Sequence, residues 1–255
     1  MNIARRIVEA AGLSPDDTVI EVGPGKGVLT RLLAREAGKV IAVEIDPKLA
    51  ERLSKEFKDE PRVTVIQQNF MSYPLPSMEK YAIVANLPYY LSTAIIQKFL
   101  SDAPWSTAII MVQKEVGQRI AASRGTKDYG AFSLFCQYYA DTFLEFPVGP
   151  ESFFPRPKID SVVLRLSNRH AEPAPPLLFP IITMSFSQRR KTILNVLSHA
   201  LNRSKEEIAA LLRSAGIDPG ARAETLTMQQ FAVLTSIVEK DILIYDGILQ
   251  KKINP

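Results

Sequence analysis

The 255-residue chain has a single cysteine, two histidines, one tryptophan and no long apolar run. The lone Cys136 excludes an internal disulfide and fits a reducing compartment, so we expect a cytoplasmic protein. His170 and His199 have neither the spacing of a metal site nor that of a catalytic triad, and we expect no metal. No apolar stretch approaches the roughly 20 residues of a membrane helix, which predicts that no membrane is a partner.

Charge is distributed unevenly along the chain. Residues 1–150 contain 17 Lys and Arg against 17 Asp and Glu, whereas residues 151–255 contain 14 against 10. The net charge of +4 therefore belongs entirely to the second part. A basic surface favours contact with a polyanion such as nucleic acid, although a solvated surface explains an excess of this size equally well.

Apolar strand-like runs alternate with helical spacing through residue 166. This alternation predicts an α/β fold, a Rossmann-like and mostly parallel sheet with helices on both faces. No helical pattern separates the last two predicted strands, so we expect them to form an antiparallel edge. The predicted strands are 18–22, 40–44, 63–67, 81–85, 106–112, 134–145 and 161–166, and the helices between them are 28–36, 47–57, 92–100 and 114–122.

Four prolines in the stretch from Asn168 to Pro180, the last of them Pro180 itself, indicate a linker. Every later pattern is helical, at residues 177–186, 192–201, 205–215 and 227–240. We expect Ser204 to cap the third of these helices and Gly216 to end it. The sequence thus predicts two domains, an α/β domain of residues 1–170 and a small all-α domain of residues 177–255.

Gly23, Gly25 and Gly27 lie between an apolar run and a helical pattern. Glycine lets such a turn adopt positive φ angles and brings its backbone close to a ligand. The spacing G-x-G-x-G differs from the G-x-G-x-x-G of dinucleotide sites, and no Lys-Ser/Thr ends the loop as in a nucleotide-phosphate site. We therefore expect Gly23 and Gly25 to lie under the amino acid and ribose of a nucleoside cofactor, with the Glu21 carboxylate beside the cleft.

Two polar residues extend this cofactor site. Glu44 ends the second predicted strand, 21 residues after Gly23, where a carboxylate can accept hydrogen bonds from both ribose hydroxyls. The alternative for Glu44 is a surface carboxylate. Asn69 follows the third strand, and its side chain would bind the adenine amino group unless it serves only the turn.

The tetrad Asn86-Leu87-Pro88-Tyr89 follows the fourth strand, so a parallel sheet places it at the same edge as the glycine loop. An aromatic exocyclic amine is a weak nucleophile, because its lone pair is delocalised into the ring. The Asn86 side-chain oxygen and the Leu87 carbonyl would hold both N–H bonds and direct the lone pair at a methyl group. Pro88 would fix the turn and Tyr89 would stack on the base. The tetrad therefore predicts methyl transfer to a base, the alternative being a strand-ending turn with a core tyrosine.

Five linked motifs closely resemble the rRNA adenine N6-dimethyltransferase family, in particular its enzymes for the bacterial small subunit. The resemblance spans almost the whole chain, from the glycine loop to the helical C-terminal part. The motifs are Glu21–Thr30, Asn86–Tyr90 with Ser92 and Thr93, Phe153–Ser161, Phe186–Thr192 and Arg222–Leu226.

The resemblance implies a class I methyltransferase with S-adenosylmethionine as cofactor. Its substrate would be two adjacent adenines in a 16S rRNA hairpin of the small ribosomal subunit or its precursor, each receiving two methyl groups. Phe153 would stack on the target base opposite Tyr89. Arg189, Arg190 and Lys191 would contact RNA phosphates, the alternative being a solvated helix end. Nothing in the sequence requires more than a monomer.

The chain departs from the family pattern at two points, and two other functions stay open. Members usually carry a basic N-terminal extension over the cofactor, and this sequence begins after that point. The alternatives are a shortened polypeptide and a chain whose lid is absent, and either would affect cofactor affinity and activity. They usually have aspartate where Asn69 stands, so we expect weaker cofactor binding. One rival is the macrolide-resistance type, which dimethylates one adenine of large-subunit rRNA; Pro24 and the C-terminal helices argue against it. The other is a non-catalytic RNA-binding assembly factor, against which the intact Asn86–Tyr89 argues.

Overall fold

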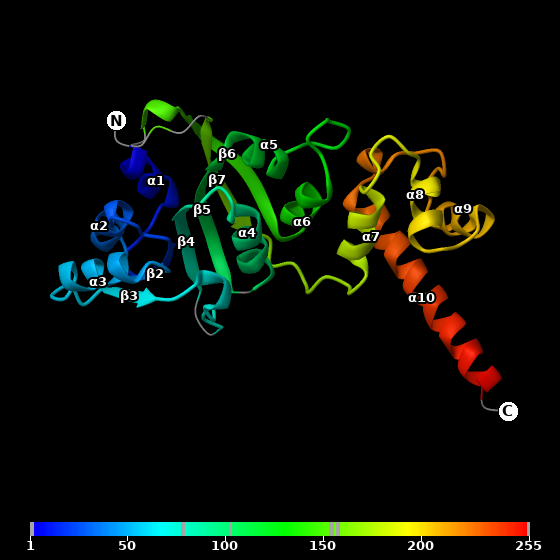
Figure 1. The fold of residues 1–255 in the computed structure, drawn as a ribbon, viewed down its shortest axis with the longest axis horizontal. Coiled ribbons are helices and arrows are strands. Elements are labelled where there is room, and N and C mark those ends of the chain that lie inside the picture. The colour runs from blue at the N-terminus through cyan, green and yellow to red at the C-terminus, as the bar shows by residue number, and fades with distance from the viewer. Residues whose placement is uncertain (1–2, 78–79, 103, 153–155, 157–158, 254–255) are drawn as a thin grey trace. The chain divides into compact units, whose positions relative to one another are not determined.

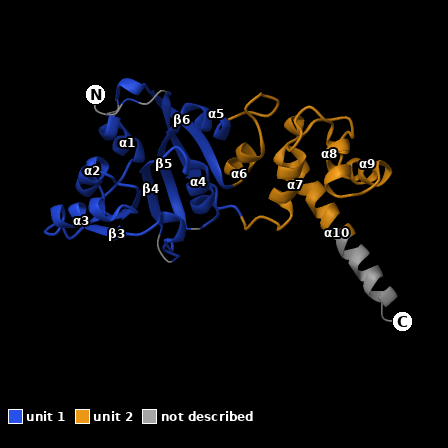
Figure 2. Ribbon diagram, viewed as in Figure 1, with its two compact units in different colours: residues 1–121, 139–171 blue, residues 122–138, 172–255 orange. Residues whose placement is uncertain are grey.

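The computed structural model describes residues 3–77, 80–102, 104–152, 156 and 159–253, with the backbone alone for 242–253. The chain forms two compact units, Met1–Ala121 with Tyr139–Ala171, and Ala122–Tyr138 with Glu172–Pro255 (Figure 2). We name them the α/β unit and the helical unit. Residues 122–138 pack with the helical unit, although the predicted boundaries place them in the first domain.

A seven-stranded sheet forms the centre of the α/β unit (Figure 1). Its strand order is β3-β2-β1-β4-β5-β7-β6; the first five are parallel, and β7 runs antiparallel to both β5 and β6. This confirms the predicted mostly parallel sheet with an antiparallel edge. The strands are β1 (Thr18–Val22), β2 (Lys39–Glu44), β3 (Val63–Gln67), β4 (Tyr81–Asn86), β5 (Trp105–Gln113), β6 (Ala140–Val148) and β7 (Ser161–Asn168).

Helices cover both faces of this sheet, as the alternating pattern predicts (Figure 1). On one face Leu33 of α2 packs with Val19 and Ile109 in a continuous apolar core. On the other face the Cα of Gly117 in α5 lies so close to Val162 that an added Cβ would stand 2.2 Å from a methyl carbon of that valine. Helix α1, which the sequence analysis did not predict, packs beside α2. The helices of the unit are α1 (Ile3–Ala11), α2 (Val28–Glu36), α3 (Pro47–Glu56), α4 (Ser92–Ser101) and α5 (Lys114–Ile120), with short 3-10 turns η1 (Phe70–Ser72) and η2 (Pro150–Ser152).

The prediction of a strand over residues 134–145 is wrong in its first half. Helix α6 (Ala131–Tyr139) occupies that part, and β6 begins only at Ala140. The segment is rich in aromatic residues, which favour strands, but its buried residues Ser133, Leu134 and Cys136 lie on one side of a helix. Leu134 joins the core of the helical unit, so tertiary packing overrides the local β preference.

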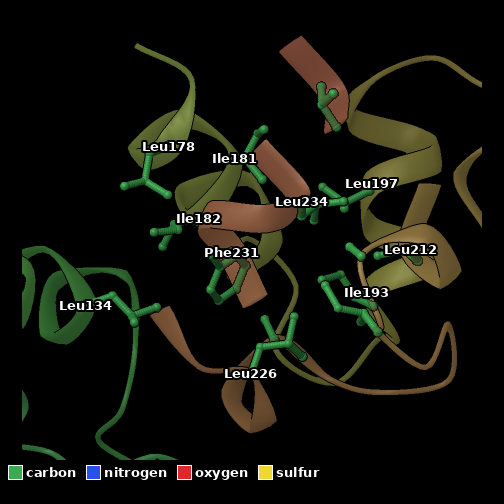
Figure 3. Close-up of a cluster of buried hydrophobic side chains, with 14 of the residues drawn as sticks. Leu134, Leu178, Ile181, Ile182, Ile193, Leu197, Leu212, Leu226, Phe231 and Leu234 are labelled. Carbon is green, nitrogen blue, oxygen red and sulfur yellow. The ribbon is translucent and has the colours of Figure 1, made fainter. Parts of the chain in front are cut away.

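The helical unit has its own apolar core (Figure 3). Ile182, Leu197 and Phe231 come from three different helices and are essentially inaccessible to solvent. Ser204 caps α9 in a capping box with Glu207, and Gly216, with φ +67°, follows the end of that helix, as predicted. The elements are α7 (Leu178–Ser185), α8 (Ile193–Ala200), α9 (Lys205–Ser214), η3 (Ala223–Thr225) and α10 (Met228–Ile253). None of the described helices has the length and apolar character of a membrane span.

Candidate functional site

The glycine loop joins β1 to α2 at the carboxyl edge of the sheet, where the strand order reverses between β1 and β4. Such switch points are where open α/β sheets bind ligands. Gly25 has φ +58°, and a Cβ placed on it would meet no protein atom within 4 Å, so the backbone faces open space. Gly27 has φ +75°, and a Cβ there would clash with Leu53, which explains the glycine by packing.

Glu44, the last residue of β2, ties the loop to the sheet. Its side chain is buried, with 5% of the residue exposed. One carboxylate oxygen accepts a hydrogen bond from the Gly25 backbone N–H at 2.9 Å, and the other accepts one from the Asp46 N–H at 2.9 Å. Each oxygen keeps a second lone pair, so the predicted bonds to ribose hydroxyls are chemically compatible with these contacts.

Glu21 of β1 is a buried carboxylate in the same region, with 1% of the residue exposed. Its Oε2 has no hydrogen-bond partner among the described residues. Burial raises the pKa of Glu21 to about 7, contacts with Thr30 oppose the rise, and the charge of Glu44 adds a smaller increase. An ionised Glu21 in this position would be stabilised by a cation bound at the loop.

We expect Glu21 to make the stability of the ligand-free protein depend on pH. Its folded-state pKa of about 7 lies above the ordinary value of 4.5. The contribution of neutral Glu21 to the free energy of unfolding is therefore fully present below pH 4.5 and is lost as pH rises through 7. Between those limits the free energy of unfolding of Glu21→Gln should rise relative to that of wild type, by up to about 3 kcal/mol. Urea unfolding of both proteins from pH 4.5 to 8 measures this difference, and parallel profiles would show that Glu21 titrates normally.

The tetrad after β4 presents two unused hydrogen-bond acceptors. The Pro88 carbonyl accepts from the Leu91 N–H at 3.1 Å, and the Tyr89 carbonyl accepts from the Ser92 hydroxyl at 3.2 Å. By contrast, the Leu87 carbonyl and the exposed Asn86 side chain accept no hydrogen bond from any described residue. Two carbonyls of the loop are thus bonded within it, whereas the two acceptors assigned to the substrate amine have no partner among the described residues.

Tyr89 is held in place through its hydroxyl, which lies 2.8 Å from the Ser161 hydroxyl at the start of β7. This contact joins the tetrad to β7. Tyr89 is half-buried, whereas Tyr90 is 84% exposed. The structure thus fixes one edge of the Tyr89 ring and leaves Tyr90 without such a constraint.

Two cavities meet at Asn86. The larger, of about 480 Å³, is bounded by the glycine loop, Glu44 and the tetrad. The smaller, of about 230 Å³, lies between α1, α2 and the ends of β4 and β5, and Met111 and Ser152 contribute to its wall. Asn86 lines both, so its side chain stands where a ligand spanning the two cavities would pass.

The remaining predicted site residues are placed as follows. Asn69 is exposed after β3, and its side-chain oxygen accepts a hydrogen bond from the Met71 N–H at 2.9 Å, capping η1. Phe153 lies outside the described residues. The three predicted phosphate contacts, Arg189, Arg190 and Lys191, belong to the helical unit and are exposed.

Sequence reasoning missed the apolar residues that line the larger cavity. Ile45 follows the buried Glu44 directly yet is 58% exposed, and Leu49 and Tyr90 also border the cavity. An exposed isoleucine beside a polar site offers a flat apolar surface to a ring. The position of Ile45 in the sequence, directly after the carboxylate that ends β2, could have identified it as a residue of the cavity.

Comparison with known sequences identifies the family. The sequence model of the family described as ribosomal RNA adenine dimethylase matches residues 1–240. A protein of Alkaliphilus metalliredigens named ribosomal RNA small subunit methyltransferase A is 41% identical over 251 residues, covering 93% of this chain and 87% of that protein. A protein of the same name from Geobacillus thermodenitrificans is 42% identical, covering 92% and 86%.

Solved structures agree with the sequence comparison. A dimethyladenosine transferase from Plasmodium falciparum has a TM-score of 0.80 at 26% identity, covering 93% of this chain and 95% of that chain. The 23S rRNA methyltransferase ErmE has a TM-score of 0.70 at 27% identity, with coverage of 93% and 97%. The fold is therefore that of a class I methyltransferase.

Proposed function

Because the chain belongs to the ribosomal RNA adenine dimethylase family, we propose that it transfers methyl groups to N6 of two adjacent adenosines in a 16S rRNA hairpin. The chain is an enzyme that uses S-adenosylmethionine, and its substrate is rRNA. The observation that carries the proposal is the pair of unused acceptors at Leu87 and Asn86, on the border of a cavity that also contains the glycine loop and Glu44.

The residues present suit S-adenosylmethionine, which supplies an activated methyl group on a positively charged sulfur. Glu44 would accept hydrogen bonds from the ribose hydroxyls, and the open backbone at Gly23 and Gly25 would lie against the nucleoside. Ile45 would cover the adenine ring, and Asn69 would bind its amino group. Glu21 would balance the positive charge of the cofactor once ionised.

Asn86 and Leu87 would align the nucleophile. The side-chain oxygen of Asn86 and the carbonyl of Leu87 each accept one N–H of the adenine amine, which points the nitrogen lone pair at the methyl carbon. S-adenosylmethionine, when bound, would supply the methyl group for a displacement in which its sulfur keeps the electron pair of the C–S bond. The methylated nitrogen would give up one proton to solvent, so that the amine product is neutral. Alignment of this kind is a large part of catalysis when no metal or strong base takes part.

Tyr89 would supply the stacking face for the base, positioned by its hydrogen bond to Ser161. Phe153 would stack from the other side. Arg189, Arg190 and Lys191 would bind RNA phosphates through the helical unit. We propose further that the enzyme is a cytoplasmic monomer that acts on the small ribosomal subunit or its precursor.

Two rival functions are weaker. The non-catalytic assembly factor does not account for the two unused acceptors at the cavity. Methylation of large-subunit rRNA is less favoured, because relatives about 40% identical over most of the chain are named small subunit methyltransferases.

The test is methyl transfer from labelled S-adenosylmethionine to purified small subunits that lack the dimethyl modification. We expect four methyl groups per subunit, placed on two adjacent adenosines by mass spectrometry of nuclease fragments. Large subunits should accept none. Calorimetric titration with S-adenosylmethionine runs beside this assay, because cofactor binding without transfer would leave the scaffold function as the better explanation. Methylation of large subunits instead would reassign the substrate.

A further inference from the structure

A loop of the helical unit, residues 123–130 between α5 and α6, is fastened to segments far away in the sequence. The Gly125 N–H donates to the Glu224 carbonyl at 2.9 Å, and the buried Tyr129 donates its hydroxyl proton to the Leu226 carbonyl at 3.1 Å. The Tyr129 ring also meets Phe186 edge to face, with centroids 6.1 Å apart. The loop is therefore a fixed part of the helical unit.

Arg189 completes this attachment. Its Nη2 donates to the Tyr129 carbonyl at 3.3 Å and lies 3.6 Å from a carboxylate oxygen of Glu224. A guanidinium shared between a loop carbonyl and a carboxylate of η3 holds the two segments together. Part of the hydrogen-bonding capacity of Arg189 is thus used inside the protein, which differs from the purely phosphate-binding role that the sequence suggested.

Three basic segments contact one another here: the loop, the stretch from Arg189 to Ile193 and the stretch from Ala221 to Glu224. The Ile193 N–H donates to the Ala221 carbonyl at 2.8 Å, which brings the residues after Lys191 beside those before Arg222. Gly125 contacts Glu224, two residues after Arg222. Arg124 directly precedes Gly125, and its positive charge opposes the rise that burial causes in the pKa of Tyr129.

Five cations of these segments are exposed and, among the described residues, have no acidic partner. The acidic residues within the same segments are Asp128, which is half-buried, and Glu224, which is paired with Arg189. The surface therefore has an excess of unpaired positive charge, which favours contact with a polyanion. We name it the basic surface, and its members are Arg124, Lys127, Arg190, Lys191 and Arg222.

We propose that Arg124 and Lys127 of the loop bind RNA phosphates as part of this basic surface, and that Arg189 and Tyr129 position the loop for it. The proposal rests on the proposed function, because it takes rRNA as the polyanion. It adds a contact segment from the middle of the chain to the predicted cations at 189–191. Exposed Arg and Lys side chains on a rigid support are suited to phosphate contact without reading the base sequence.

The test compares RNA binding by charge-neutralised variants at several salt concentrations. Arg124→Gln with Lys127→Gln should lower the slope of log Kd against log salt by about 1.5 and weaken binding to small subunits roughly tenfold at physiological salt. Lys205→Gln with Arg213→Gln is the matched control, since it removes two exposed charges from α9 of the same unit. We expect that control to change the slope little.

A second variant tests the positioning role. Tyr129→Phe removes the hydroxyl bonded to Leu226 and leaves the charge unchanged. It should weaken RNA binding several-fold in the wild-type background and have no effect in the Arg124→Gln, Lys127→Gln background, because residues acting through one contact are non-additive. An equal loss in both backgrounds would mean that Tyr129 acts only on stability.

Failure of this inference can be told apart from failure of the proposed function. If wild type methylates small subunits and the loop variant binds them with unchanged slope, the loop does not contact RNA. If both charge pairs lower the slope equally, the effect is one of net charge and the basic surface is not a specific contact. If wild type neither binds nor methylates small subunits, the proposed function itself is wrong.

Discussion

Replacing Glu44 by alanine should reduce affinity for S-adenosylmethionine by a factor of about 10² to 10⁴, since each hydrogen bond to a charged group contributes about 1.5–3 kcal/mol. The substitution removes two proposed ribose contacts. It also removes the acceptor that fixes the Gly25 N–H, so the loop loses its attachment to β2. Both effects act on binding, and calorimetric titration of the folded variant measures their sum.

Two further variants separate the causes of that loss. Glu51→Ala removes the same charge from an exposed position on α3, where Glu51 forms an ion pair with Lys55, and should bind the cofactor as wild type does. Glu44→Gln keeps one acceptor oxygen and should give an intermediate affinity. Unchanged affinity of Glu44→Ala would remove Glu44 from the ribose site.

Asn86→Ala should lower the methyl-transfer rate by about 10²–10³-fold, because one of the two acceptors that align the amine is lost. Asn86 is exposed at the end of β4, and its side chain makes no hydrogen bond within the described residues, so the fold should tolerate the change. Binding of small subunits depends on other residues and should persist. Single-turnover transfer and a separate RNA-binding measurement give the two quantities.

The matched comparison is Asn86→Asp, which keeps an acceptor oxygen of the same shape and adds a negative charge. It should retain more transfer than Asn86→Ala, because an acceptor for the amine is still present. Transfer at the wild-type rate by Asn86→Ala would exclude Asn86 from the alignment of the nucleophile. Loss of small-subunit binding together with transfer would instead place Asn86 in substrate binding.

The sequence predicts the sheet and the cofactor edge well for a physical reason. Buried parallel strands read as short apolar runs, and the residues that end them lie at one edge whatever the details of packing. On these grounds Gly25, Glu44 and Asn86 were predicted to lie at one edge, and they border one cavity, while their roles stay predictions. The contact between Glu44 and the Gly25 N–H was not predictable in this way, because it depends on the path of the loop.

Other features depend on contacts between distant residues and leave little trace locally. The segment 131–139 has the composition of a strand, and only the core formed with Phe231 and Leu178 explains why it is helical. The hydrogen bond between Tyr89 and Ser161 joins residues 72 positions apart. Likewise, the partners of Arg189 come from two segments with no common motif.

The helical unit is built from two separate stretches of the chain, and this has a consequence for its synthesis. Residues 122–138 are made first, then β6 and β7 of the α/β unit, and only then the remainder of the helical unit. Leu134 therefore leaves the ribosome well before Phe231, with which it shares a core. The apolar side chains of the α6 segment therefore cannot be buried in this core until most of the polypeptide has been made. A nascent chain that pauses after β7 would consequently be a natural client for a chaperone.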